Sequence, residues 1–347
     1  MRRNTILFST LLLLAGVVAP LTAAEADVAR TPSGKPDLSG TYDVATLTPM
    51  QRDPKFGERV YLTQEEADAI ASGAEAREAR GLAPSDPDRT APPAGGNIGA
   101  YNSFYFDRGS GAVMVDGKYR TSLLTDPPNG RFPPLTDKGK ARREGLYSFM
   151  GKNSAEVWWQ GQQVGPYDGP ETFSIADRCI YSMEATIPIL SKSYNNIKTI
   201  VQTDDYVMIH IEWMSHARII RIGSEHLPEG VRSRSGDSVG WWEGDTLVVD
   251  TTNFLEEKWY TTTLFGEPSP AEDQRVVERL TPVEGGDLHY EFSVTTSDYT
   301  APYTGSYTWP ATESRAYEYA CLEGNYAMGN SLRGARFLER EAASSGR

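Results

Sequence analysis

The chain has 347 residues, with 47 acidic and 34 basic side chains that give a net charge of −13 at pH 7. An acidic chain without a basic cluster repels the phosphates of nucleic acids and anionic membrane surfaces, so neither is expected as a partner. With 32 glycines, 22 prolines and 18 tyrosines, the composition favours many short strands over long helices.

The first 24 residues predict a cleavable secretory signal peptide. Arg2 and Arg3 precede an apolar run over residues 6–18, and residues 22–24 supply the small side chains that signal peptidase requires. The run is too short and wrongly flanked for a stable membrane anchor. We therefore expect a periplasmic or secreted protein without a membrane anchor.

Residues 25–100 are expected to form an N-terminal extension with a surface helix and a flexible loop. A strand is expected over residues 38–44. Thr63 and Glu66 form a capping box, which predicts a helix that continues to about Arg80. Residues 82–99 are rich in proline, glycine and small polar residues, which is typical of a flexible loop.

Residues 101–342 are expected to form a β domain with a C-terminal helix. A capped helix is predicted from Thr136 to about Met150, and the last helix from about Tyr326 to Glu341. Short apolar or alternating runs separated by turn residues predict strands at 103–107, 113–115, 119–125, 197–202, 206–218, 239–242, 246–252, 275–283, 288–296, 303–309 and 317–321. Residues 217–222 either continue the strand at 206–218 or pair back against it.

These strands predict an all-β fold, an antiparallel meander with a few peripheral α-helices. A sheet of so many strands must protect its edges, and closure into a lipocalin-like barrel does so most simply. A barrel of about eight strands can hold one small ligand. The alternative fold is a β-sandwich.

The stretch Tyr206 to Arg218, YVMIHIEWMSHAR, has two faces of opposite chemistry. Its alternation with a period of two indicates a half-buried strand. One face carries Val207, Ile209, Ile211 and Trp213, and the other carries Met208, His210, Glu212, Met214, His216 and Arg218. Methionine mixed with histidine suits a semi-polar cavity wall. The alternatives are a solvated sheet face and a cross-strand salt-bridge network.

The catalytic candidates are His216, Glu212, Arg218 and His210. A carboxylate beside an imidazole fixes its tautomer and raises its pKa, which suits general acid–base chemistry. A guanidinium suits the binding of an acidic ligand group. The expected ligand-binding residues are Met208, Met214, Tyr101, Asn102, Tyr105 and Trp241. No phosphate loop and no dinucleotide fingerprint occurs, so we expect no cofactor. No histidine or further cysteine stands at finger-like spacing to either cysteine. A metal site of His210, Glu212 and His216 is conceivable, but on an ideal strand His210 and His216 stand roughly 20 Å apart, too far for one metal without a bend, so we expect no metal.

Cys179 and Cys321 are the two cysteines of the chain. In an oxidising compartment an even pair predicts a disulfide. The alternative is two buried thiols that never meet.

Five long motifs are spread over the chain from residue 100 onward: AYNSFYFDRG at 100–109, RTSLLTDPPNGRFPPLT at 120–136, YNNIKTIVQTDDYVMI at 194–209, GDSVGWWEGDTLVVDTTNF at 236–254 and YEYACLEGNYAMGNSLRGAR at 317–336. In these motifs the chain resembles a large uncharacterised family of exported proteins from soil and aquatic bacteria. The resemblance implies export and one shared architecture, and it implies no mechanism. The chain departs from the family pattern at His210 and Leu322, so neither position is expected to serve a chemistry common to the family.

The sequence therefore predicts an exported β-barrel protein that holds a small apolar or aromatic molecule in an internal cavity. One alternative is a cofactor-independent lyase, isomerase or hydrolase that acts on such a molecule through His216 and Glu212. The other is an envelope interaction protein whose acidic surface meets a basic partner.

Overall fold

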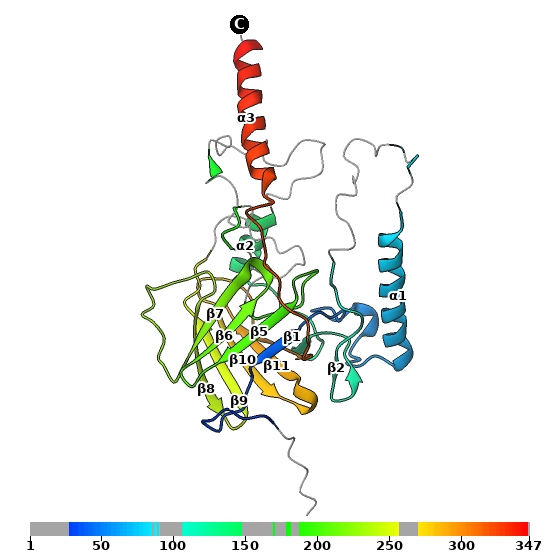
Figure 1. The fold of residues 1–347 in the computed structure, drawn as a ribbon, viewed down its shortest axis with the longest axis vertical. Coiled ribbons are helices and arrows are strands. Elements are labelled where there is room, and N and C mark those ends of the chain that lie inside the picture. Colours follow the sequence, from blue (N-terminus) through cyan, green and yellow to red (C-terminus); the bar gives the residue numbers. More distant parts are fainter. Residues whose placement is uncertain are drawn as a thin grey trace, which may run out of the picture.

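The computed structural model describes residues 28–84, 87–88, 90, 106–147, 169–170, 178–181, 187–256 and 270–345. Ten strands of this part form one curled sheet in the order β1-β5-β6-β7-β8-β9-β10-β11-β12-β4, and β2 and β3 form a small hairpin (Figure 1). The strands are β1 (Gly40–Asp43), β2 (Met114–Val115), β3 (Lys118–Tyr119), β4 (Leu124–Asp126), β5 (Ile197–Gln202), β6 (Tyr206–Ile211), β7 (His216–Ile222), β8 (Asp237–Glu243), β9 (Thr246–Thr252), β10 (Arg275–Pro282), β11 (Leu288–Thr295) and β12 (Tyr303–Trp309).

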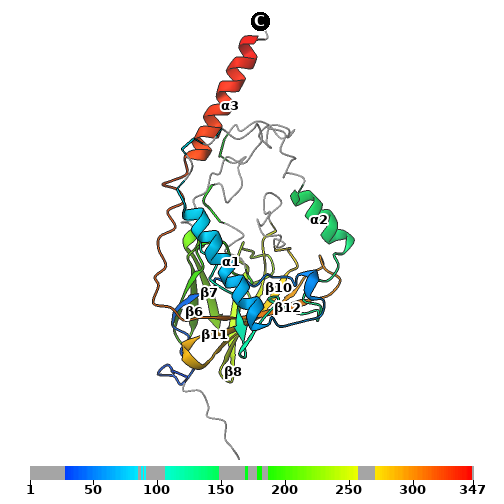
Figure 2. The ribbon, with the colours of Figure 1, turned by 90° about the vertical axis from the view of Figure 1, so that its right-hand side faces the viewer.

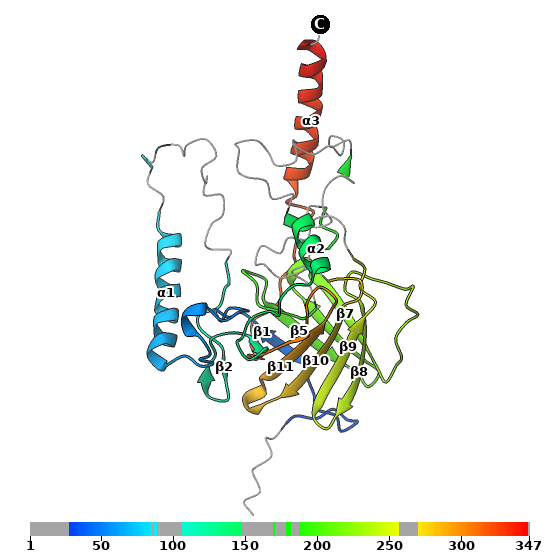
Figure 3. The ribbon, with the colours of Figure 1, turned by 180° about the vertical axis from the view of Figure 1, so that it is seen from behind.

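The α-helices of the described chain lie around the sheet. They are α1 (Gln64–Leu82), α2 (Asp137–Tyr147) and α3 (Tyr326–Ser345), and short 3-10 turns occur at η1 (Pro54–Phe56), η6 (Trp213–Ser215) and η7 (Glu284–Gly286). Both hydrogen bonds of the predicted capping box are present at the start of α1. Helix α3 points away from the sheet in each view, and α1 stands at its side (Figures 1, 2 and 3).

The sheet is a curled half-barrel, so the prediction of a closed barrel is wrong. Strands β1 and β4 stand at opposite ends of the strand order and do not pair with each other. The chain after β12 contacts β1 at one corner, where Asp43 N–H donates to Pro310 O and Thr312 N–H donates to Thr41 O. The meander also breaks once, because β7 and β8 run parallel. Their connection, residues 223–236, is too long for a hairpin turn.

The β-sandwich alternative is wrong as well, since the second sheet consists of two strands of two residues each. Strand β1 comes from the expected N-terminal extension, yet it pairs with β5 along its whole length. The N-terminal region therefore contributes directly to the main sheet.

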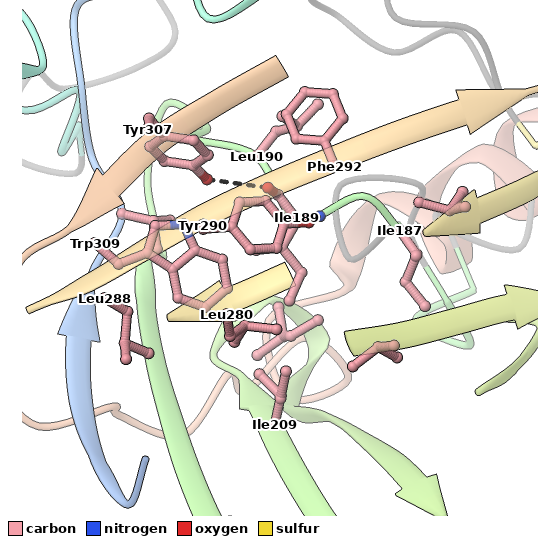
Figure 4. Packing of buried hydrophobic residues seen from close by; sticks show 14 of the residues in the cluster. Ile187, Ile189, Leu190, Ile209, Leu280, Leu288, Tyr290, Phe292, Tyr307 and Trp309 are labelled. Atoms are coloured by element: carbon pink, nitrogen blue, oxygen red, sulfur yellow. Dashed lines mark hydrogen bonds between the residues drawn. The ribbon is translucent and has the colours of Figure 1, made fainter. Parts of the chain in front are cut away.

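The concave face of the sheet holds the hydrophobic core. Residues 187–190 lie across this face, where Ile189 N–H donates to the hydroxyl of Tyr290 at 2.9 Å and Tyr307 donates its hydroxyl to Ile189 O at 3.0 Å (Figure 4). The indole of Trp309 stacks on Tyr290, with ring centroids 4.4 Å apart. Ile209 reaches the same core from β6.

Most predicted elements are confirmed, and three strands, 197–202, 246–252 and 303–309, have the predicted bounds. The prediction of a strand at 317–321 is wrong, because two backbone N–H groups there donate to side chains on the turn between β6 and β7. The run 119–125 is split between β3 and β4. The expected strand 103–107 and flexible loop 82–99 fall mostly outside the described residues.

Candidate functional site

A turn divides the stretch 206–218 into two strands. Strand β6 ends at Ile211, η6 follows, and β7 begins at His216. Met214 and Ser215 have φ angles of 57° and 46°, which place them in the left-handed region and reverse the chain. The prediction of one continuous strand over 206–218 is therefore wrong, and the alternative in which residues 217–222 pair back is confirmed.

The turn also changes which side chains share a face. Residues directly opposite each other on neighbouring strands point to the same side of a sheet. Arg218 lies opposite Ile209, and His216 lies opposite Ile211. His216 and Arg218 therefore point toward the concave, core-bearing side, and Met208 and His210 point to the convex side.

Arg218 belongs to a fully buried polar network. Its guanidinium forms an ion pair with both carboxylate oxygens of Glu278 and donates to the hydroxyls of Ser238 and Thr251. The hydroxyl of Tyr290 donates to Glu278 at 2.6 Å. Burial, and then the neighbouring carboxylate, raise the pKa of Tyr290 well above its ordinary value, so this hydroxyl keeps its proton. All polar groups of Arg218 are thus engaged inside the protein.

Glu212 is buried at the turn and binds backbone. Its two carboxylate oxygens accept hydrogen bonds from Tyr317 N–H at 3.2 Å and Ile197 N–H at 3.4 Å. Within the described part of the chain, no hydrogen bond joins Glu212 to His216. The carboxylate thus ties the β6–β7 turn to the segment that follows β12.

One imidazole nitrogen of His216 has no hydrogen-bond partner among the residues that the structure describes. This Nε2 atom is buried and makes no hydrogen bond within the described structure. The ring of Tyr181 packs edge-on against the imidazole, with centroids 5.4 Å apart. Burial, followed by the charges of Arg218 and His210, lowers the pKa of His216 below its ordinary value of 6.5. The imidazole is therefore neutral at pH 7.

Lys198 lies in the same row of side chains as His216. It pairs with Ile211, which in turn pairs with His216, so the two titratable residues point to one face with their Cα atoms roughly 10 Å apart. The ammonium donates to Asn195 O at 3.1 Å and to Ile197 O at 3.4 Å. Burial, only partly offset by Glu212, lowers the pKa of Lys198 from 10.5 to about 7.

Aromatic rings surround the turn. Trp213 is buried between Tyr194, at 4.4 Å between centroids, and Tyr319, at 5.8 Å, and both contacts are stacked. Met214 packs against the core beside them. The stack of Tyr194, Trp213 and Tyr319 therefore lies at the turn that leads into His216.

The other predicted site residues do not join this group. Met208 and His210 point to the convex side, as does Trp241, which is 39% exposed and donates its indole N–H to Glu243. Tyr101, Asn102 and Tyr105 lie outside the described residues. Of the predicted set, the structure brings Glu212, Met214 and His216 together at one end of the sheet.

The disulfide between Cys179 and Cys321 is confirmed. It joins two segments that reach this end of the half-barrel, one leading into Tyr181 and the other leaving Tyr319. The alternative of two separate thiols is therefore wrong.

A second titratable cluster, which the sequence reasoning missed, lies on the convex face. The imidazole of His226 lies 2.9 Å from Asp237 and 3.4 Å from Asp250. Arg221 pairs with the first carboxylate and Arg275 with the second. Asp237 also accepts Leu227 N–H, so the cluster fastens the connection between β7 and β8 onto the sheet.

Comparison with family models, with curated proteins and with solved structures finds no match to this chain. Within the described ranges, no helix has both the length and the apolar character that a membrane span requires. The same residues contain no group of three or more histidine, cysteine or acidic side chains arranged to hold a metal ion.

Proposed function

We propose that the protein binds a small aromatic molecule that carries a hydroxyl group, at the end of the half-barrel formed by the β6–β7 turn. The observation that carries this proposal is the buried Nε2 atom of His216, which has no hydrogen-bond partner in the described part of the chain. Leaving such an atom unpaired costs about 1–3 kcal/mol, so native proteins retain few of them. A ligand hydroxyl that donates to Nε2 removes this cost.

The surroundings of His216 support an aromatic ligand. Tyr181 presents a ring edge to the imidazole, and the stack of Tyr194, Trp213 and Tyr319 lies around the adjoining turn. The lowered pKa keeps the imidazole neutral at pH 7, which leaves one ring nitrogen able to accept a hydrogen bond. A few polar groups in an aromatic setting are typical of small-molecule sites.

We further propose that the protein works outside the cytoplasm. The disulfide supports an oxidising compartment. The arginine-flanked apolar run at residues 1–24 has the composition of a secretory signal.

A fluorescent phenol, 1-naphthol, tests the binding site. Titration of the wild type should show saturable binding, and His216→Leu should weaken it at least five- to tenfold, the equivalent of one hydrogen bond of about 1 kcal/mol. His210→Leu is the matched control, because His210 pairs with Ala217, the residue after His216, and points to the opposite face of the sheet. Native mass spectrometry of protein from its own host should find a bound aromatic hydroxyl compound. Equal affinity in the wild type and His216→Leu contradicts the proposal.

A cofactor-independent acid–base enzyme is the second candidate, and Lys198 favours it. The pKa of Lys198 is lowered to about 7, and the lowered pKa of His216 leaves its imidazole neutral at pH 7. The two residues stand on one face of the sheet, on β5 and β7, with β6 between them. Such a pair can exchange protons with a bound substrate near pH 7. In this case, turnover in a panel of hydroxylated aromatic substrates should be lost in His216→Gln and in Lys198→Met but kept in His210→Leu.

A further inference from the structure

The chain between β12 and α3, residues 310–325, runs along the side of the sheet toward the base of α3 (Figure 2). We call it the strap. It is bonded to β1 at its start, through Pro310 and Thr312. It contains no regular secondary structure until α3 begins.

The strap crosses the β6–β7 turn and binds it at three points. Tyr317 N–H donates to the carboxylate of Glu212 at 3.2 Å, and Tyr319 N–H donates to the hydroxyl of Ser215 at 3.3 Å. The ring of Tyr319 stacks on Trp213. Each residue of the turn that makes these contacts lies within four positions of His216.

The disulfide fastens the strap at its far end. Cys321 follows Tyr319 by two residues, and its partner Cys179 precedes Tyr181 by two. Tyr181 is the ring that packs against His216. Asn325 at the start of α3 also donates its side-chain amide to the sulfur of Cys179 at 3.6 Å. One covalent bond therefore secures both the ring beside His216 and the strap over the neighbouring turn.

We infer that the strap and its disulfide form a closure over the His216 site, and that this bond controls how readily the site exchanges with solvent. This closure would control access to the ligand site proposed above, and the identity of the ligand rests on that proposed function. Its structural content is independent of any ligand, since Nε2 of His216 is buried in the fastened state. At the β6–β7 turn, the described contacts that remain once the disulfide is cut are the hydrogen bonds to Glu212 and Ser215 and the ring contact with Trp213. Such non-covalent contacts open far more often than a covalent tether.

Diethyl pyrocarbonate, which acylates neutral imidazole nitrogen, is the probe. His216 should react slowly in the wild type and at least tenfold faster in the double variant Cys179→Ser/Cys321→Ser, as measured by peptide mass spectrometry over time. The reaction of His210 should change little, because it points to the other face. Circular dichroism shows whether the double variant keeps its fold.

A second variant keeps the disulfide and removes a strap contact. Tyr319→Leu should raise the rate at His216 by a smaller factor, and it decides the question if the double variant does not fold. Unchanged rates at His216 in folded variants overturn the closure. If the wild type does not bind 1-naphthol but His216 still reacts faster in the variants, only the proposed ligand is overturned.

Discussion

Lys198 is a base whose protonation couples to folding. Its folded-state pKa is lowered to about 7, so between about pH 7 and 10.5 the folded protein binds fewer protons here than the unfolded chain does. The contribution of this residue to stability therefore rises with pH through that window. Below pH 7 the burial penalty on the charged form is present in full.

Replacing Lys198 by methionine should remove this dependence. Relative to the wild type, Lys198→Met should be most favoured at pH 6, and its advantage should shrink by up to about 1.4 kcal/mol per pH unit between pH 7.5 and 9. Urea unfolding of both proteins at pH 6, 7.5 and 9 measures the difference. Lys140→Met, at an exposed lysine, serves as control. If the difference in unfolding free energy between Lys198→Met and the wild type does not change with pH, the lowered pKa of Lys198 is contradicted.

The pair Arg218 and Glu278 should behave as one unit. Removing one partner leaves a charge buried, so Arg218→Met should lower the free energy of unfolding by about 3–5 kcal/mol. The double variant Arg218→Met/Glu278→Leu should recover much of this loss, because no buried charge remains. A double-mutant cycle by urea unfolding measures the coupling, and additive single effects rule it out. The exposed pair Arg279 and Glu243 should show far weaker coupling.

Some of these residues were readable in the sequence and others were not. Val276, Glu278 and Leu280 stand two residues apart, so the period-two pattern places the carboxylate of Glu278 on the same face as two apolar side chains. Lys198 likewise shares its face with Ile200. The turn after Ile211 was not recognisable, because it contains no glycine or proline and the alternation of apolar and polar residues continues through it in the sequence. Two left-handed residues, Met214 and Ser215, reverse the chain without the glycine, asparagine or aspartate that usually adopts this conformation.

At the scale of the element, β12 depends on a glycine. Gly305 lies directly opposite Phe292, and the buried ring fills the space that a Cβ atom at Gly305 needs. Gly305→Ala should therefore lower stability by about 1–3 kcal/mol, the usual cost of overpacking a core. Gly73→Ala in helix α1 meets open space and should raise stability by up to about 1 kcal/mol. Thermal melts of the two variants should shift in opposite directions, and a common direction contradicts this account.

Part of the strap, residues 317–321, was wrongly predicted as a strand. Residues 317–321 have the aromatic, alternating composition of a strand, but neighbouring strands leave no backbone edge for them at this place. Their N–H groups bond side chains instead. Strand propensity is a property of a segment by itself. Strand pairing also requires an open sheet edge nearby, and whether one exists depends on distant parts of the chain.

At the scale of the whole molecule, the β-rich fold and the order of β8 to β12 follow from local patterns. Each of those strands pairs with its neighbour in sequence, and turn residues mark most of the connections. Whether the sheet closes into a barrel was not predictable in the same way. It depends on the parallel step between β7 and β8 and on β1 and β4 at the two ends, which are pairings between distant parts of the chain.

The positions of β1 and β4 have a consequence for the order of assembly. Strands β5 to β12 form a continuous block of the sheet, built from residues 197–309. The two outermost strands both come from the first 126 residues and pair with partners more than 150 positions later. Local hairpins form before such distant pairs, because the loops that join distant partners cost more entropy. The part of the chain synthesised first is therefore the part that joins the sheet last, and it protects both edges only once the block is complete.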